Sequence, residues 1–195
     1  MKKLLTVMLA LLLLAGCARR EGATRTDQLQ QRYADLASYR AEVSLDLPRE
    51  DETLHYALSV EGKDGDARVT VREPEMLAGI TAELSGEDLA LTYDGMTLDA
   101  LSLSPNVSAV NAVPLILRAA AQGYMRAENR EKLGEEETLR LELELEHAGE
   151  MLGCTAWFAA DDTLRRAELS ADGKIILAAE FTNFEFGDIL LETKG

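Results

Sequence analysis

A mainly β fold (α+β) is what the sequence predicts: a meander of about ten antiparallel strands, with an N-terminal helix and a helical insertion available to cover its apolar face. Three observations lead to this expectation. Apolar and polar residues alternate in many short segments, Asp-Gly pairs separate several of them, and one long apolar stretch interrupts the series. Alternation with a period of two places every second side chain on the same face, so the strands share one buried face.

The first ordered element is expected to be a helix over about residues 26–37. Thr24 and Asp27 have the spacing of a capping box, in which each side chain accepts a hydrogen bond from the other residue's backbone. An apolar stripe with the i, i+4, i+7 spacing marks the face that this helix buries. Its members are Leu29, Tyr33 and Leu36.

Strands are expected on both sides of the helical insertion. Before it, the alternating segments are 39–47, 54–61, 67–71, 76–84, 88–93 and 96–103. After it, they are 124–130, 138–146, 151–160, 163–170 and 174–182. The Asp-Gly pairs at 64–65, 94–95 and 172–173 fit two-residue hairpin turns, because Asp-Gly tolerates the positive φ angles that such turns require. The clearest strand is 138–146, where a helix would spread its four alternating leucines around its surface.

The insertion is expected to be helical over 105–122. Ser104-Pro105 is a typical helix start, and Gly123 is a typical stop. Pro114 lies inside this stretch, so we expect two short helices or a kink there. Arg118 is the single charged residue between Pro105 and Gly123, and a helix that is apolar nearly all round is buried or covers a hydrophobic surface.

Residues 1–16 have the features of a secretory signal peptide. Lys2 and Lys3 precede a run of 13 apolar and small residues, Leu4 to Gly16, which is shorter than the roughly 20 residues that a membrane-spanning helix needs. The run ends in Leu-Ala-Gly-Cys, which resembles the bacterial lipobox, in which the cysteine is acylated and becomes the first residue of the mature protein. The alternative is an ordinary secretory signal with an incidental cysteine.

The expected organisation follows from this resemblance. Residues 1–16 are a lipoprotein signal peptide, 17–25 are the lipidated Cys17 and a short tether, and 26–195 are one folded domain. A palmitate-type acyl chain on Cys17 would hold the domain on the extracytoplasmic face of the cell membrane. The tether carries three arginines, which fit either a basic collar against anionic headgroups or an ordinary solvated linker.

Charge and cysteine content restrict the possible partners. The formal net charge is −15, and a body this acidic repels phosphates, so we do not expect a nucleic-acid partner. The chain has two cysteines, and if Cys17 carries lipid, Cys154 has no partner for an internal disulfide. Cys154 lies in an apolar segment, so we expect a buried, inert thiol.

Catalytic motifs are scarce. No nucleophile elbow, phosphate-binding glycine loop or paired zinc-binding histidines occur in the sequence. His55 and His147 are far apart in the chain, and we expect both at the surface. The run Glu135-Glu136-Glu137 fits a solvated strand entry better than a cation site. We therefore expect no catalytic residue, no metal, no cofactor and no enzyme activity.

Several segments together resemble one known family. They are Tyr33-Ala34-Asp35-Leu36, Tyr39-Arg40-Ala41-Glu42-Val43, Val69-Thr70-Val71-Arg72-Glu73-Pro74, the insertion 105–123 and Phe181-Thr182-Asn183-Phe184. In order and pattern they are similar to the LolA/LolB-like lipoprotein-carrier superfamily, including the germination-type lipoproteins of spore-forming bacteria. The resemblance implies a curved, unclosed antiparallel half-barrel with helices over its concave face. It also implies binding of lipid, of lipoprotein acyl chains or of a protein partner, without catalysis.

The residues expected to line a ligand site face inward from the sheet or come from the covering helix. From the sheet they are Val43, Leu45, Leu58, Val60, Leu141, Leu143 and Trp157, and from the helix they are Leu115, Ile116 and Leu117. Two interpretations stay open: a cavity that holds an acyl chain or a partner's apolar segment, and a packed core with no vacancy.

The resulting hypothesis is an anchored binding protein for lipid, lipoprotein or a cell-envelope protein. The alternative is a scaffold or regulator of a cell-wall enzyme in spore germination, with a filled core and no lipid ligand. A competing class, an envelope hydrolase, would need clustered His, Ser and Asp residues.

Overall fold

The computed structural model describes residues 24–86, 88–98 and 107–187. The helices are α2 (Arg25–Ala34), the 3-10 turn η1 (Glu75–Leu77) and α3 (Ala112–Gln122). The strands of the first half are β1 (Ser38–Pro48), β2 (Thr53–Lys63), β3 (Asp66–Glu73), β4 (Thr81–Ser85), β5 (Asp88–Tyr93) and β6 (Met96–Leu98). Those of the second half are β7 (Tyr124–Leu133), β8 (Glu136–His147), β9 (Glu150–Phe158), β10 (Leu164–Ala171) and β11 (Lys174–Phe186).

All the strands form one antiparallel sheet, which is open and curved. Its order is β6-β5-β4-β3-β2-β1-β11-β10-β9-β8-β7, so within the described residues the sheet contains eleven strands and two meanders that meet where β1 pairs with β11. The chain runs outward from β1 to β6, crosses the sheet through α3 and returns from β7 to β11. The expected half-barrel with helices over its concave face is confirmed.

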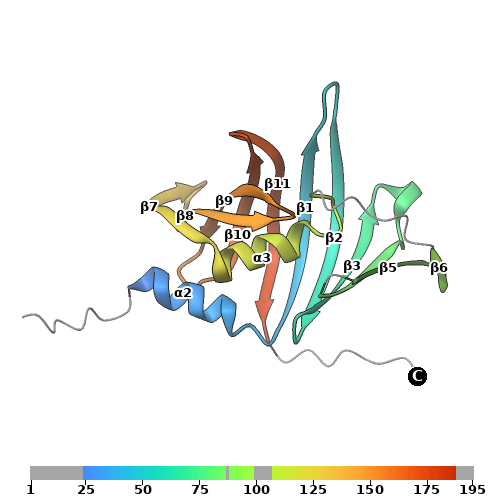
Figure 1. The fold of residues 1–195 in the computed structure, drawn as a ribbon, viewed down its shortest axis with the longest axis horizontal. Coiled ribbons are helices and arrows are strands. Elements are labelled where there is room, and N and C mark those ends of the chain that lie inside the picture. Colours follow the sequence, from blue (N-terminus) through green and yellow to red (C-terminus); the bar gives the residue numbers. More distant parts are fainter. Residues whose placement is uncertain (1–23, 87, 99–106, 188–195) are drawn as a thin grey trace, which may run out of the picture.

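The helices cover only part of this face. Figure 1 shows α2 and α3 over the strands of the second meander, while β3, β4, β5 and β6 continue beyond the helices and are called the wing from here on. The buried core lies between the helices and the sheet, and alternating inward residues of β1 and β8 contribute to it, for example Val43, Leu45, Leu141 and Leu143. The position of this core restricts where a ligand can bind, because free space on the apolar face can exist only where the helices do not cover it.

Helix α2 begins as the sequence predicts. Thr24 Oγ1 accepts a hydrogen bond from the Asp27 backbone at 3.1 Å, and Asp27 Oδ2 accepts one from the Thr24 backbone at 2.8 Å, which together form the capping box. The pKa of Asp27 is lowered, chiefly by its hydrogen bond from the Thr24 backbone. The helix ends at Ala34, three residues before the expected end at residue 37, and Leu36 packs against the core from the connection to β1.

Two expectations about regular structure are wrong. Residues 76–84 do not form one strand: η1 and a turn with Gly79 at φ +88° precede the short β4. Helix α3 is a single helix that begins at Ala112, so Pro114 is its third residue and causes no kink. The first four backbone N–H groups of a helix have no partner within the helix, so the missing N–H of Pro114 costs no hydrogen bond. The expected start at Ser104-Pro105 lies outside the described residues.

A β-bulge in β11 brings two phenylalanines to the same face. Val43 of β1 pairs with Phe181 and Glu42 pairs with Asn183, so Thr182 is the extra residue of β11. Phe181 and Phe184 are three positions apart, and in a regular strand they would point to opposite faces. With the bulge, both are about 5% exposed and lie in the core.

Candidate functional site: an apolar groove beside the helices

A hollow of about 1150 Å³ lies between the helices and the strands of the wing. Its walls are the end of α2 with residues 35–37, one side of α3, the hairpin turn at 63–66, the turn between β4 and β5, and the turn after β8. The hollow opens to solvent and is called the groove from here on. Protein sites for small ligands typically enclose roughly 300–1,000 Å³, so the groove has room for an extended ligand.

The floor of the groove is one row of neighbours across five strands. Tyr39 pairs with Gly62, Gly62 with Ala67, Ala67 with Leu84, and Leu84 with Leu89. Four of the five line the groove. The remaining one, Gly62, lies beneath the ring of Tyr39, which would overlap with a Cβ atom at that position. The strand register therefore produces a continuous apolar floor.

Aromatic rings close the end of the groove next to α2. The Tyr39 ring stacks on Phe184 with centroids 6.1 Å apart, and the Tyr33 ring meets Phe158 edge-on at 5.4 Å. Tyr33 donates its hydroxyl hydrogen to the carbonyl oxygen of Asp162 at 2.9 Å. Burial raises the pKa of Tyr33 and of Tyr39, so both phenols stay protonated at neutral pH and act as apolar walls with one polar atom each.

The rim of the groove is acidic. Among the described residues that line it, five carboxylates face two cations. The carboxylates are Asp35, Asp64, Asp66, Asp88 and Glu146, and the cations are Lys63 and Arg118. Arg118 donates to the Glu146 carbonyl oxygen at 3.3 Å and to His147 Nδ1 at 3.2 Å. The groove thus combines an apolar floor with a negatively charged border.

The residues expected to line a ligand site fall into three groups. Leu115 and Leu117 line the groove. Val43, Leu45, Leu58, Val60, Leu141, Leu143 and Ile116 are at most 3% exposed, belong to the packed core and do not line the groove. Trp157, the remaining one, lies on the other face of the sheet. The packed core and the cavity that the sequence left as alternatives therefore correspond to different parts of the same apolar face. The packed core lies beneath the helices, and the groove lies beside it.

Trp157 was expected to face inward, and this expectation is wrong. In β9 the core residues are Cys154, Ala156 and Phe158, so Trp157 has the opposite parity. Its ring lies between the guanidinium groups of Arg140 and Arg166, 5.6 Å and 5.8 Å from its centroid. Its Nε1 donates to Glu131 at 2.5 Å. Trp157 is buried by these charged neighbours and not by the core.

Five groove residues were not predicted from the sequence: Tyr39, Ala67, Leu84, Leu89 and Ala121. Alternation in β1, β3, β4 and β5 already places most of them on the apolar face. No signal in the sequence shows that the helices stop short of these strands, so their place at a vacancy could not be predicted.

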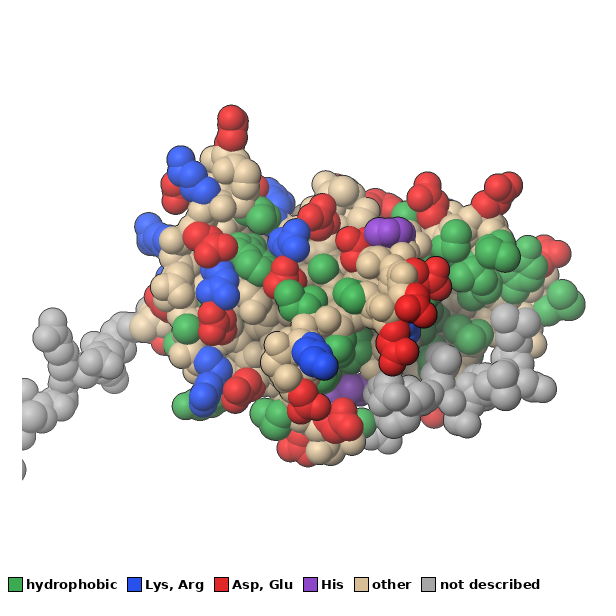
Figure 2. Space-filling model, turned by 90° about the horizontal axis from the view of Figure 1, so that it is seen from above, with side chains coloured by type: hydrophobic (Ala, Val, Ile, Leu, Met, Phe, Trp, Pro, Cys, Tyr) green, Lys and Arg blue, Asp and Glu red, His purple; other side chains and the backbone are tan. Residues whose placement is uncertain are grey.

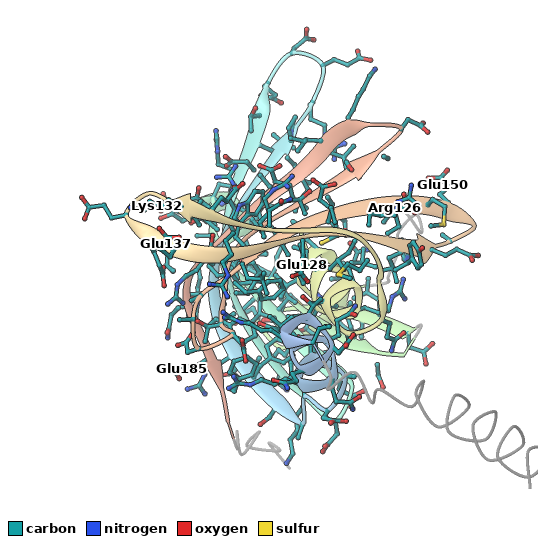
Figure 3. The ribbon with its side chains drawn as sticks, turned by 90° about the vertical axis from the view of Figure 1, so that its left-hand side faces the viewer. Arg126, Glu128, Lys132, Glu137, Glu150 and Glu185 are labelled. Atoms are coloured by element: carbon teal, nitrogen blue, oxygen red, sulfur yellow. The ribbon has the colours of Figure 1, made fainter. Side chains whose placement is uncertain are left out.

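Charged side chains cover the face of the sheet that points away from the helices, and they also cover the edge of the sheet. Edge strand β7 carries Arg126 and Lys132, which pair with Glu144 at 3.5 Å and Glu137 at 3.7 Å on β8 (Figure 3). Figure 2 shows acidic and basic side chains close together over one end of the molecule and hydrophobic side chains gathered at the other end, over the wing. Met76, Tyr93 and Met96, in or next to the wing, are 87%, 46% and 62% exposed.

Solved structures with little sequence identity have a similar fold. An uncharacterized conserved protein from Thermus thermophilus matches with a TM-score of 0.50 and 13% identity, over 83% of this chain and 85% of that one. A LolA superfamily protein from Nitrosomonas europaea matches with a TM-score of 0.43 and 12% identity, over 84% and 94% of the two chains. The lipoprotein LppX from Mycobacterium tuberculosis matches with a TM-score of 0.42 and 15% identity, over 80% and 91%.

The solved structures that match include a member of the LolA superfamily, the family that the sequence resembles. The resemblance expected from the sequence is confirmed at the level of fold, and identities this low say nothing about a ligand. No protein-family model matches the sequence, and no curated protein matches it.

The titratable groups of the described residues are dispersed. His55 is exposed and contacts Asp46 at 2.7 Å, whereas His147 lies beside the groove. Burial raises the pKa of the Cys154 thiol to about 12, and the expected buried thiol is confirmed. Among the described residues, no three His, Cys, Asp or Glu side chains are grouped so as to hold a metal ion. None of the described helices is both long and apolar enough to cross a bilayer.

Proposed function

We propose that this chain is a membrane-anchored, extracytoplasmic binding protein that holds a hydrophobic ligand in the groove and catalyses no reaction. The ligand is a lipid, a lipoprotein acyl chain or an apolar segment of a cell-envelope protein. The single observation that carries the proposal is the vacancy of about 1150 Å³ over the row Tyr39–Ala67–Leu84–Leu89. Exposed apolar surface is costly in water, and an apolar ligand that covers it is stabilised by roughly 25 cal/mol per Å² of surface removed from water.

The anchor in this proposal is Cys17, which lies outside the described residues together with the rest of the lipobox. Helix α2 begins at Arg25, eight residues after Cys17, and eight residues reach at most about 28 Å. A groove on a body held this close to the bilayer would meet lipids and the envelope-facing segments of membrane proteins. The division into signal peptide, tether and domain stays a prediction.

The filled core beneath the helices supports the second candidate, a scaffold or regulator of a cell-wall enzyme with no lipid ligand. Seven of the ten residues expected at a ligand site are buried in that core and do not line the groove. In that case the groove would take a protein segment, and no lipid would accompany the purified chain.

The test uses the full mature chain with Cys17→Ser, which removes the lipid attachment site. Native mass spectrometry detects any co-purifying lipid, and the fluorescence of N-phenyl-1-naphthylamine, an uncharged apolar dye, reports occupancy of apolar sites. Ala121→Trp fills the groove from α3, and Ala160→Trp is the matched control at an exposed position outside it. We expect Ala121→Trp to reduce dye binding at least fivefold and the control to leave it unchanged. Absence of dye binding by the parent chain, or equal binding by both variants, overturns the proposal.

A further inference from the structure

The aspartates at one end of the groove are brought together by backbone pairing. The Asp64 backbone donates to the Ala37 carbonyl oxygen at 2.8 Å, which ties the β2–β3 hairpin turn to the segment that contains Asp35. Ser85 pairs with Asp88 across the turn between β4 and β5, and Leu84 pairs with Ala67, so this second turn lies next to the hairpin. Asp35, Asp64, Asp66 and Asp88 consequently border the same end of the groove.

Among the described residues, these carboxylates lack cationic partners, as several exposed acidic residues do, whereas many glutamates on the strands are paired with arginines. Elsewhere arginines pair with glutamates on neighbouring strands, for example Arg40 with Glu61 at 2.8 Å and Arg166 with Glu180 at 2.8 Å. None of the four groove aspartates forms an ion pair within the described parts of the chain. The Asp35 carboxylate accepts a hydrogen bond from Gln31 Nε2 at 2.8 Å, which is an uncharged donor. Four like charges around one opening repel each other, and a cation placed among them lowers that repulsion.

We propose that the groove binds a peptide segment of another envelope protein, in which basic side chains accompany the apolar ones. This inference rests on the proposed function and specifies its ligand class. The apolar side chains would lie on the floor, and the lysines or arginines would meet the aspartates at the rim. The net charge of −15 acts in the same direction, because it attracts basic segments from a distance and repels acidic ones.

The same charges argue against an anionic lipid as the occupant. A fatty acid or an acidic phospholipid that lay in the groove would bring its negative head close to a border where five carboxylates face two cations. Repulsion between the negative head and the carboxylates of the rim weakens binding, whereas a lysine side chain in the same place is attracted to them and strengthens it. The groove is open to solvent, which also fits a segment that enters and leaves as part of a longer chain.

The experiment measures three synthetic peptides of 12 residues by isothermal titration calorimetry against the mature chain with Cys17→Ser. The first alternates Leu and Lys, the second has Gln in place of Lys, and the third has Glu in place of Lys. The triple variant Asp64→Asn, Asp66→Asn and Asp88→Asn removes three carboxylates of the rim. The triple variant Glu50→Gln, Asp51→Asn and Glu52→Gln is the matched control, since it changes net charge equally at exposed positions outside the groove. Thermal unfolding of both variants shows that they fold.

The Lys peptide should bind most tightly and the Glu peptide least tightly. Each exposed ion pair contributes a factor of about 1.5 to 5 in affinity, so the loss of three pairs in the rim triple variant should weaken binding of the Lys peptide by about 3- to 100-fold and leave binding of the Gln peptide almost unchanged. The control variant should lose less than about twofold, and added salt should weaken Lys-peptide binding to the parent chain and to the control variant more than to the rim triple variant.

The outcomes separate this inference from the proposed function. Equal affinity for the three peptides, or an equal loss in both triple variants, overturns the inference. The inference is also overturned if palmitate binds and displaces N-phenyl-1-naphthylamine while the Lys peptide does not bind. The proposed function then survives, with a lipid as the ligand. If neither the dye nor any peptide or palmitate binds, the proposed function itself is overturned.

Discussion

Replacing Gly62 with alanine tests the close approach of β1 and β2 at the floor of the groove. Gly62 is buried in extended β2, opposite Tyr39 of β1, and the Tyr39 ring occupies the place where a Cβ atom would be. Tyr39 is 7% exposed and stacks on Phe184, so its ring has few alternative positions. The alanine methyl group must displace either the ring or the strand.

Three contributions determine how much Gly62→Ala changes the free energy of unfolding. Overpacking of a well-packed core costs about 1–3 kcal/mol, and displacement of the ring from its stack costs up to about 1.5 kcal/mol more. Alanine in an extended backbone recovers about 0.4–1 kcal/mol, because it restricts the unfolded chain more than glycine does. We therefore expect Gly62→Ala to lower the free energy of unfolding by about 1–3 kcal/mol. In a Tyr39→Ala background the obstacle is absent, and Gly62→Ala should stabilise the protein by about 0.4–1 kcal/mol.

The assay is urea unfolding of the four members of this double-mutant cycle, followed by Trp157 fluorescence and far-ultraviolet circular dichroism. Gly153→Ala is the control, because a Cβ there lies 2.5 Å from Ser170 Oγ, a hydroxyl that moves away by rotation. Its cost should be below about 1 kcal/mol. If Gly62→Ala costs the same with and without the Tyr39 ring, the ring is not the cause and the reasoning about the groove floor fails.

Three further predictions concern the core, the thiol and the anchor. Leu141→Ala should cost about 2–5 kcal/mol in urea unfolding, because Leu141 is fully buried in the centre of β8; a cost under 1 kcal/mol would contradict the packed core. The pKa of the Cys154 thiol is about 12 in the folded chain and roughly 8.5 in the unfolded chain, so the unfolded state loses this proton first. The stability due to the protonated thiol is therefore intact below about pH 8.5 and is lost as pH rises toward 12, and Cys154→Ala should flatten the decline measured between pH 8.5 and 10. Finally, Cys17→Ser should move the protein from the membrane fraction to the soluble fraction of a bacterial host, and equal fractionation of both proteins would reject the lipid anchor.

Much of the fold could be predicted because its signals are local. Alternation in β1, β2 and β8 identifies the buried face, the capping box places the start of α2, and Asp64, Asp94 and Asp172 each adopt a positive φ before glycine, as the predicted hairpin turns require. The errors occur where local signals conflict. Ala156-Trp157-Phe158-Ala159 is apolar at every position, so its parity is not visible in the sequence, and the pairing of β9 with Leu139, Leu141 and Leu143 of β8 decides that Trp157 faces outward. The spacing of Phe181 and Phe184 likewise depends on a bulge that arises only when β11 pairs with β1.

The sequence by itself determined that one apolar face runs across the whole sheet, because side-chain direction in a strand depends on the residue's own position and on nothing distant. Only the tertiary structure decided which part of that face remains open. The groove exists because α2 and α3 pack against each other and over the second meander and stop short of the strands of the wing. Coverage of this kind depends on contacts between segments that are far apart in the chain, and periodicity within a single segment carries no information about them.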